Sequence, residues 1–464
     1  MINFFDDIER YGKNTAVVTE NGEKISYRAL LETADGLAAH TAPRSLVFLV
    51  CENRFECIAA YIGFLRRRTV PVMISSKLDL AMLNLLTDAY KPNYIFTKSS
   101  EKYGSELAKT GGYALYKGQA DEGLIANDDL AVLLTTSGST GSPKLVRQSY
   151  ANITANANSI AQYLKIVPTD RAITTMPMSY TYCLSIIQSH LLMGATVIAT
   201  EATLLDKKFW ELLKGEKATT FGGVPYTYEI LKKLRFGRME LPSLRYITQA
   251  GGKLSPELSL EFATVCKEKG VEFIVMYGQT EATARMSYLP HEFAISKAGS
   301  MGIAIPGGRF SLRDADGTEI TDAEKVGELV YKGENVTMGY AESRADLSRG
   351  DDNCGTLFTG DMAKRDADGF YYIVGRKKRF LKIFGNRVNL DEVEELLKKE
   401  GYACACIGRD DNMKIYCESN VEEEEIVDFV SKTTGLNRKA FSALHIDKIP
   451  RNEAGKILYA ELEL

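Results

Sequence analysis

The chain of 464 residues contains little of what several large classes of protein depend on. It has 4 histidines, none near another or near a group of cysteines, which argues against a zinc site and against a Cys/His nucleophile. Its 57 Lys and Arg residues against 61 Asp and Glu residues give a net charge of −4, so no general field attracts nucleic acid or anionic lipid. An anionic ligand must therefore be bound locally.

Long apolar runs and a targeting signal are also missing. The run at 57–65 ends in Arg66-Arg67-Arg68, far short of the roughly 20 apolar residues that span a membrane. The N-terminus, MINFFDDIER, is acidic instead of positively charged. The 8 cysteines are scattered, and Cys404-Ala-Cys406 alternates as in a strand, so we expect reduced thiols. The sequence predicts a soluble, cytoplasmic protein with neither a membrane nor a nucleic-acid partner.

The chain alternates short β-rich apolar runs with helix-length amphipathic segments, which predicts an α/β fold with largely parallel sheets. After about Pro306 the pattern changes to short strands with tight turns, including DADG at 314–317 and again at 366–369. The remainder after GRKKR (375–379) has the length of a small α+β domain. The expected strands are 45–50, 69–74, 93–97, 131–134, 172–176, 195–199, 244–248, 272–277, 403–408 and 413–417, and the expected helices are 152–164, 183–193, 256–268 and 390–399.

The stretch TTSGSTGSPK (135–144) combines hydroxyls and glycines directly after the apolar run at 131–134. Glycines let the backbone approach a phosphate, hydroxyls and N–H groups donate to its oxygens, and Lys144 neutralises charge. The alternative is an ordinary flexible Ser/Gly loop, against which Pro143 argues because it stiffens the segment. The stretch does not match the GxxxxGK[ST] loop of common ATPases.

Further motifs follow this loop in order along the chain. They are YGQTE (277–281), TGD (359–361), GR (375–376) and PRNEAGK (450–456). Together with the loop they resemble the ordered signature of the adenylate-forming superfamily of acyl-CoA synthetases, peptide-synthetase adenylation domains and firefly luciferase. The resemblance implies a large N-terminal domain (1–377), with two stacked α/β subdomains and a β-barrel-like unit. It also implies a small mobile α+β C-terminal domain (378–464).

The resemblance also implies the chemistry and the cofactors. A carboxylate attacks the α-phosphorus of ATP, with Mg²⁺ present, and a thiol then captures the acyl-adenylate, so catalysis depends on positioning and electrostatics. Taken singly, each residue has a structural interpretation: a core aromatic, a helix-start carboxylate, a turn residue or a solvated lysine. Their order along the chain favours the functional one. The implied nucleotide-binding residues are Thr136, Ser137, Gly138, Ser139, Thr140, Gly141, Lys144, Gly251, Gly252, Tyr277, Asp361 and Arg376, with Glu281 as the metal ligand and Lys456, Thr280 and Glu281 as catalytic residues.

The stretch MSYTYC (178–183) occupies the place of the family's acid-binding aromatic motif. Amino-acid-activating relatives carry an Asp about where Thr181 stands, so we expect a small carboxylic acid without an α-amino group. Glu229 or Asp206 remains an alternative source of a carboxylate. The expected pocket residues are Tyr180, Thr181, Tyr182, Val224 and Met276.

Two departures from the family pattern stand out. Many members carry Asp at the hinge, where this chain has Lys378, and many carry His where this chain has Tyr150, which we expect beside the nucleotide. Gly385, in KIFG (382–385), resembles the loop residue that leaves room for a pantetheine arm. We therefore expect rotation about Lys378 between two half-reactions.

Three functions remain open at this point. The first is an acid–thiol ligase with coenzyme A, or the phosphopantetheine of a separate acyl carrier protein, as acceptor. The second is an adenylating enzyme with a non-thiol acceptor. The third is a nucleotide sensor without catalysis, against which the presence of Glu281, Asp361 and Lys456 argues. Dependence of turnover on a thiol separates the first two.

We predict that Lys456→Ala nearly abolishes acyl-adenylate formation and leaves thioester formation from supplied adenylate largely intact. A lysine on a mobile domain stabilises the transferring charge in one orientation only. The two half-reactions are measured separately, by pyrophosphate release and by conversion of synthetic acyl-adenylate. Equal loss in both would contradict the assignment.

Overall fold

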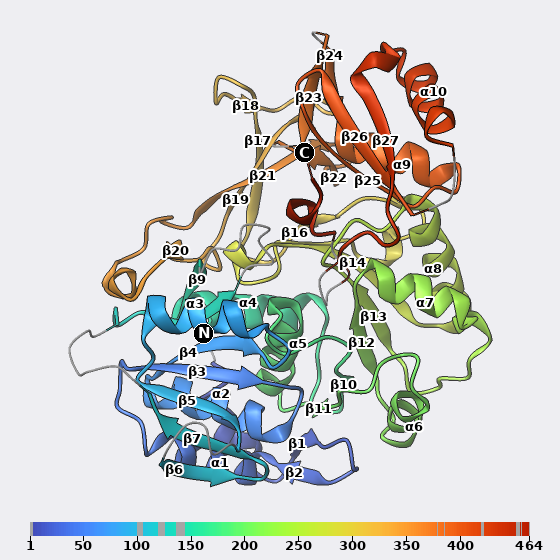
Figure 1. The fold of residues 1–464 in the computed structure, drawn as a ribbon. Coiled ribbons are helices and arrows are strands. Elements are labelled where there is room, and N and C mark those ends of the chain that lie inside the picture. Colours follow the sequence, from blue (N-terminus) through green and yellow to red (C-terminus); the bar gives the residue numbers. More distant parts are fainter. Residues whose placement is uncertain are drawn as a thin grey trace. The chain divides into compact units, whose positions relative to one another are not determined.

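The computed structural model describes residues 3–99, 105–118, 126–135, 144–377, 379–384, 386–418, 422–451, Gly455 and 457–463. The described residues form two compact units, coloured by sequence in Figure 1. The first takes in the described residues up to Thr135, then 144–310 and 331–357. The second takes in 311–330 and the described residues from Phe358 onward. The domain boundary expected between 377 and 378 stays a prediction.

One sheet of the first unit has the strand order β16-β15-β14-β13-β12-β10-β11-β1-β2. The strands from β14 to β1 pair in parallel, and antiparallel pairs close both edges. The bounds are β1 (Thr15–Val18), β2 (Lys24–Ser26), β10 (Arg171–Ile173), β11 (Thr196–Ile198), β12 (Thr220–Gly223), β13 (Tyr246–Gln249), β14 (Glu272–Tyr277), β15 (Ser287–Tyr288) and β16 (Ile303–Ala304).

The other sheet of this unit has the order β20-β9-β8-β4-β3-β5-β7-β6. Its central strand β3 is an almost continuous apolar run, LVFLVC, and nearly all of it is buried, as expected for a strand covered on both faces. The bounds are β3 (Leu46–Cys51), β4 (Val70–Ser75), β5 (Tyr94–Lys98), β6 (Glu106–Thr110), β7 (Tyr113–Lys117), β8 (Leu130–Thr135), β9 (Leu145–Ser149) and β20 (Tyr340–Ala341).

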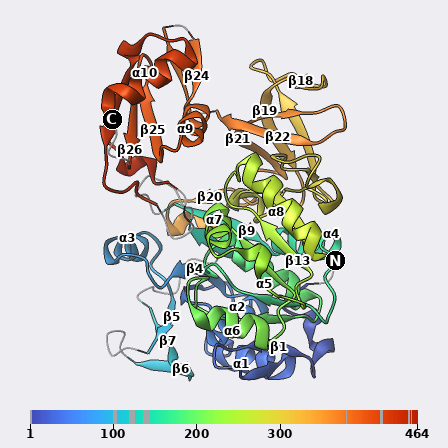
Figure 2. The ribbon, with the colours of Figure 1, turned by 90° about the vertical axis from the view of Figure 1, so that its right-hand side faces the viewer.

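Two helices lie between these sheets (Figures 1 and 2). Helix α4 packs against β8 and β9, helix α5 packs against β10 and β11, and the two helices pack on each other. Helix α4 begins directly after β9 because Ser149 caps it: its hydroxyl accepts from the Asn152 N–H at 3.0 Å. This confirms the predicted pair of stacked α/β subdomains. The helices of the unit are α1 (Tyr27–Ala38), α2 (Phe55–Arg67), α3 (Leu80–Tyr90), α4 (Tyr150–Tyr163), α5 (Thr181–Leu192), α6 (Lys207–Gly215), α7 (Pro225–Lys233) and α8 (Pro256–Lys269).

The second unit holds most of a sheet with the order β18-β17-β19-β21-β22, followed by an α+β segment. The two DADG sequences form the predicted turns, in which Gly317 N–H donates to the Asp314 carbonyl and Gly369 N–H to the Asp366 carbonyl. The elements are β17 (Arg309–Arg313), β18 (Glu319–Ile320), β19 (Gly327–Lys332), β21 (Thr356–Arg365), β22 (Tyr371–Arg376), β23 (Phe380–Ile383), β24 (Asn386–Asn389), α9 (Leu390–Lys399), β25 (Cys404–Arg409), β26 (Asn412–Cys417), α10 (Glu423–Thr434) and β27 (Phe441–His445).

The expectation of reduced thiols is wrong for one pair of cysteines. Cys404 on β25 and Cys417 on β26 lie opposite each other in the antiparallel register and form a disulfide. The alternation of Cys404 and Cys406 was correctly interpreted as a strand, but the sequence alone did not show which residue of the next strand faces Cys404.

The helices of the described residues are short. The two longest of these, α4 and α8, have 14 residues each. Over the part of the chain that the structure describes, no helix is both long enough and apolar enough to cross a membrane.

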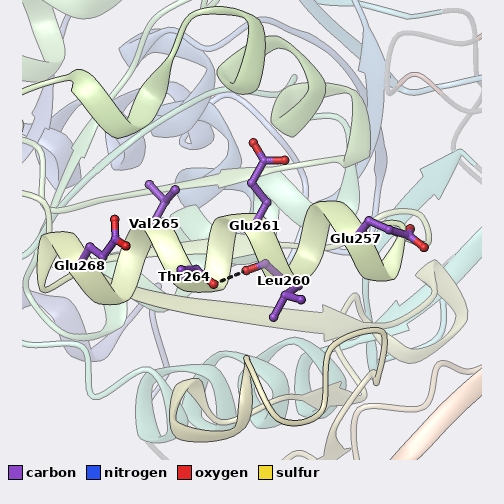
Figure 3. Close-up of a pocket in the computed structure, with 6 residues that line it drawn as sticks. All are labelled: Glu257, Leu260, Glu261, Thr264, Val265 and Glu268. Atoms are coloured by element: carbon purple, nitrogen blue, oxygen red, sulfur yellow. Dashed lines mark hydrogen bonds between the residues drawn. The ribbon is translucent and has the colours of Figure 1, made fainter.

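A shallow hollow follows the outer surface of α8 (Figure 3). It is lined by Glu257, Leu260, Glu261, Thr264, Val265 and Glu268, all on this one helix. The Thr264 hydroxyl donates to the Leu260 carbonyl of the preceding turn, and Lys232 pairs with Glu261 at 2.6 Å. None of the predicted site residues borders this hollow.

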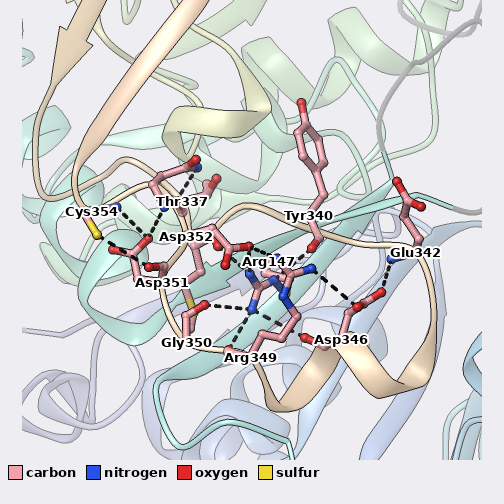
Figure 4. Close-up of polar contacts among 12 residues, drawn as sticks. Arg147, Thr337, Tyr340, Glu342, Asp346, Arg349, Gly350, Asp351, Asp352 and Cys354 are labelled. Carbon is pink, nitrogen blue, oxygen red and sulfur yellow. Dashed lines mark hydrogen bonds and ion pairs between the residues drawn. The ribbon is translucent and has the colours of Figure 1, made fainter.

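A fully buried arginine fastens β20 and the segment after it to β9 (Figure 4). The Arg147 side chain, on β9, is 0% exposed. Its Nη1 donates to the carbonyls of Arg349 and Gly350, and its Nη2 donates to the Asp352 carboxylate at 2.6 Å. Its Nε donates to the carbonyl of Tyr340 at 3.2 Å. A buried charge of this kind is tolerated because its hydrogens are shared among carbonyls and one carboxylate.

We predict that Arg147→Met lowers the free energy of unfolding by about 3 kcal/mol or more, because the Asp352 carboxylate and several carbonyls lose their donor. The matched control is Arg349→Met. Arg349 also pairs with Asp352, at 2.8 Å, but its side chain is 51% exposed, so we expect less than about 1 kcal/mol. Urea unfolding followed by circular dichroism measures both. Similar losses in the two variants would contradict this view of Arg147.

Candidate active site

The motif YGQTE forms the end of β14 and the short 3-10 helix η4 (Thr280–Ala282). Residues outside this turn donate hydrogen bonds to three of its backbone carbonyls. The Gln148 side chain donates to the Thr280 carbonyl, and the Thr337 N–H donates to the Glu281 carbonyl. The Asn335 side chain donates to the Ala282 carbonyl. Gly278 is required because a Cβ there would lie 1.7 Å from the Ala284 carbonyl oxygen. These contacts therefore fix the backbone that carries the side chains of Thr280 and Glu281.

Tyr340 connects the predicted metal ligand to the predicted phosphate-binding lysine. Its hydroxyl donates to Glu281 Oε1 at 2.7 Å, and Lys144 Nζ lies 3.7 Å from the centroid of its ring. Burial and the neighbouring carboxylate raise the pKa of Tyr340, so the hydroxyl stays protonated and donates. The structure thus brings Lys144 and Glu281 to one side chain, although they are 137 positions apart in the sequence.

Gly251 and Val224, predicted for different parts of the site, lie together beside Tyr180. Gly251 has a φ of +82°, and a Cβ there would lie 2.7 Å from the Tyr180 hydroxyl and 3.0 Å from Val224 Cγ1. A side chain at position 251 would fill this space, and the backbone conformation also disfavours one. Gly252 lies against Pro225. Burial raises the pKa of Tyr180 to about 12, so its hydroxyl is neutral.

The other predicted pocket residues differ in burial. Thr181 is half-buried at the start of α5, whereas Tyr182 and Met276 are each 3% exposed. The Tyr182 hydroxyl lies 2.7 Å from the Thr248 hydroxyl, and the rings of Tyr180 and Tyr182 have centroids 6.5 Å apart. Tyr182 and Met276 therefore belong to the packed interior under Tyr180 and not to an open surface.

The second unit brings together two of the residues predicted to bind the nucleotide. Asp361 on β21 lies directly opposite Arg376 on β22, and Arg376 Nε is 3.7 Å from Asp361 Oδ1. The Asp361 side chain is 8% exposed and that of Arg376 is 62% exposed. The carboxylate is thus held in place, and the guanidinium remains accessible.

Comparison with known sequences decides the family. The sequence profile described as "AMP-binding enzyme" matches residues 4–341. The chain belongs to this AMP-binding enzyme family. It is 29% identical over 350 residues to a 2-succinylbenzoate–CoA ligase of Bacillus licheniformis, covering 72% of this chain and 70% of that protein. A 2-succinylbenzoate–CoA ligase of Bacillus cereus is 28% identical over 472 residues, covering 97% and 95% of the two chains.

Solved structures share the fold. O-succinylbenzoate coenzyme A synthetase (MenE) from Bacillus subtilis, in complex with AMP, has a TM-score of 0.81 at 22% identity and covers 100% of this chain and 98% of its own. ATP-bound MatB from Rhodopseudomonas palustris has a TM-score of 0.77 at 21% identity, covering 99% of each chain. This AMP-binding enzyme is an AMP-forming acid–thiol ligase: it activates a carboxylic acid with ATP through an acyl-adenylate and passes the acyl group to a thiol.

The site of this AMP-binding enzyme fits a magnesium ion carried in with the nucleotide. Among the described residues, no group of three His, Cys, Asp or Glu side chains forms a preassembled metal site. Mg²⁺ is commonly held by one or two carboxylates together with phosphate oxygens, and the oriented Glu281 carboxylate supplies such a ligand beside Lys144.

Several predicted residues lie outside the described part of this AMP-binding enzyme. They are Thr136, Ser137, Gly138, Ser139, Thr140, Gly141, Lys378, Gly385 and Lys456. Their roles stay predictions.

Tyr150, expected beside the nucleotide, lies away from Lys144. Tyr150 begins α4 at the far end of β9 from Lys144, where its ring packs against Phe5 and under the Arg68 guanidinium. It therefore does not lie beside Lys144. The strand β9 separates Tyr150 from Lys144, so adjacency in sequence does not bring their side chains together.

Sequence reasoning missed Tyr340, Arg147 and Arg285. No sequence signal connects Tyr340 to Glu281, which is 59 residues away, because their contact results from pairing of β20 with β9. Arginines also have no sequence pattern that separates a buried one from an exposed one.

We predict that Tyr340→Phe weakens the apparent affinity for Mg²⁺ roughly 10-fold or more, since a hydrogen bond to a charged group contributes about 1.5–3 kcal/mol. The phenyl ring still lies beneath Lys144. Pyrophosphate release is measured against Mg²⁺ concentration at saturating ATP. Tyr372→Phe is the matched control, because Tyr372 also donates to a carboxylate, that of Asp366 in the second unit. An unchanged Mg²⁺ dependence in Tyr340→Phe would contradict the positioning role.

Proposed function

We propose that this enzyme is a coenzyme A ligase for a small carboxylic acid that lacks an α-amino group. The observation that carries the proposal is the Tyr340 hydroxyl, 2.7 Å from the Glu281 carboxylate, with Lys144 over the same ring. This cluster supplies a metal ligand and a cation at one place, as transfer at the α-phosphorus of a magnesium nucleotide requires.

In the first half-reaction, a carboxylate oxygen of the acid attacks the α-phosphorus, the bond to the bridging oxygen breaks, and pyrophosphate leaves. Lys144 and the loop at 136–141 hold the departing phosphates. Thr280 donates to the α-phosphate, and Glu281 would hold Mg²⁺, whose charge would offset that of the phosphates. Lys456 stabilises the reacting carboxylate and the α-phosphate.

The nucleoside is bound by residues of the sequence motifs. Tyr277 stacks on adenine, Gly251 and Gly252 let the backbone approach its edge, and Asp361 accepts from the ribose hydroxyls with Arg376 as its partner. In the second half-reaction the thiol sulfur attacks the acyl carbonyl carbon and AMP leaves. Rotation about Lys378, with Gly385 beside the pantetheine arm, separates the two steps.

The nature of the acid follows from charge. Thr181 is neutral and half-buried, so an α-ammonium beside it would lose hydration without gaining a carboxylate. Of the two alternatives considered, Asp206 is exposed and accepts from Thr203, while Glu229 is half-buried on α7. Because the curated relatives act on 2-succinylbenzoate, this acid is the first candidate.

Coenzyme A is favoured as acceptor because the named relatives are coenzyme A ligases. The phosphopantetheine of an acyl carrier protein and a non-thiol acceptor remain outcomes of the test. A cytoplasmic location also stays a prediction, and the Cys404–Cys417 disulfide removes the support that we drew from reduced thiols.

We predict that pyrophosphate release from ATP depends on a carboxylic acid without an α-amino group. Matched acids and their α-amino analogues of the same skeleton, 2-succinylbenzoate first, are screened with and without coenzyme A. An unpaired buried ammonium costs several kcal/mol, so we expect discrimination of at least about 100-fold against the amino members. Faster turnover of the amino members would show that the pocket supplies a carboxylate. Product that forms without any thiol would favour the second class of function.

A further inference from the structure

Arg285 is an arginine whose side chain lies in the protein interior. It follows η4 through two residues in left-handed conformations, Thr283 with a φ of 53° and Ala284 with a φ of 90°. Such conformations are unfavourable for residues with a side chain and persist only where the surroundings impose them. Asn156 and Asn335 both donate to the Arg285 carbonyl, at 2.9 and 3.0 Å, and hold this backbone. The Arg285 side chain is consequently only 2% exposed.

The partners of this guanidinium are all neutral. Nε donates to the Ser185 hydroxyl at 3.1 Å, and Nη1 donates to the Tyr163 hydroxyl at 3.1 Å and to Met276 Sδ at 3.2 Å. The guanidinium carbon lies 5.0 Å from the centroid of the Tyr182 ring. Among the described residues, Nη2 has no hydrogen-bond acceptor, and none of the carboxylates forms an ion pair with Arg285.

This arrangement differs from that of other buried arginines in the chain. Arg147 is paired with Asp352, and Arg379, whose side chain is 12% exposed, with Asp391 and Glu394. Asp170 could supply a carboxylate in the first unit, but Arg245 already binds it through two nitrogens. A guanidinium remains protonated in proteins, so burial without an anion is costly. The cost is offset when a ligand brings the anion.

Some neighbours of Arg285 are also residues predicted for the acid pocket. Met276 and Tyr182 both contact it, and both were predicted from the sequence to contact the acid. Tyr182 lies beside Tyr180, whose hydroxyl reaches the Gly251 backbone, where the nucleotide is expected. Two tyrosine rings, those of Tyr182 and Tyr180, thus connect the guanidinium to Gly251.

We propose that Arg285 binds a second carboxylate of the substrate, at the end of the acid opposite to the carboxyl group that is adenylated. The substrate is therefore a dicarboxylic acid. Nη2 donates to the second carboxylate, and the hydroxyls of Ser185 and Tyr163 keep the guanidinium in orientation. The proposal rests on the proposed function, since it concerns the same pocket. It assigns to the pocket a residue that the sequence motifs did not include.

The test compares acids that differ by one carboxylate. For the unmodified enzyme, kcat/KM for pyrophosphate release is measured with 2-succinylbenzoate, with 2-butanoylbenzoate and with 4-oxo-4-phenylbutanoate. Straight-chain diacids and the monoacids of equal length form a second series. A site built around a charged donor rejects analogues that leave it unpaired, so we expect a preference of at least about 100-fold for a diacid in one of the two series.

The variants separate binding from support of the fold. In Arg285→Gln the diacid preference falls towards unity, mainly through a higher KM for the diacid, and Arg285→Lys retains part of it. A purely structural role would lower turnover of all acids by the same factor and leave the preference intact. Arg349→Gln, which changes an exposed arginine of the same unit, keeps the full preference.

The results distinguish this proposal from the function on which it rests. Monoacids that are turned over as well as their diacid partners by the unmodified enzyme would overturn the assignment of Arg285 and leave the ligase function standing. A diacid preference that survives in Arg285→Gln would do the same. Absence of pyrophosphate release with every acid would overturn both. If Arg285→Gln does not fold, the comparison of acids on the unmodified enzyme still decides.

Discussion

The geometry of the site in the first unit depends on one buried charge, the guanidinium of Arg147. Its hydrogens bind the backbone carbonyls of Met338, Tyr340, Arg349 and Gly350 and the carboxylate of Asp352. These bonds hold β20 against β9, the strand that begins directly after Lys144. The Tyr340 ring is thereby placed between Lys144 and Glu281. A group that never touches the substrate thus determines how the groups that do touch it are arranged.

Arg147 and Arg285 show two uses of the same side chain. Both are almost completely buried, and both are held by several hydrogen bonds. Arg147 has a carboxylate of its own chain and so contributes to stability, whereas the described residues that bond the Arg285 guanidinium are all neutral. The difference between them is the missing anion. The proposed role of Arg285 follows from this difference, because a negatively charged ligand gains more from such a buried cation than a neutral one.

The candidate functional groups belong to two units, and a different structural feature positions them in each unit. In the first unit they are placed by strand ends and by one turn, in which Gly278 and the left-handed Thr283 and Ala284 fix the backbone. In the second unit, antiparallel register places Asp361 opposite Arg376. The same kind of register joins Cys404 to Cys417. Register is therefore the common determinant of the pairs in this unit.

The sequence by itself determined the classes of element and the family. Apolar runs such as 45–50 and 272–277 predict strands, and the helix at 256–268 was located to within one residue at its C-terminal end, because these signals are local. The ordered motifs also identified Glu281 and Asp361 as candidates. Only the tertiary structure decided which side chains meet: Tyr340 with Glu281, Arg285 with Tyr182, and Tyr150 with Phe5. These contacts depend on burial, with its loss of hydration, and on strand register. Both arise from residues far apart in the chain, so no local sequence pattern encodes the contacts.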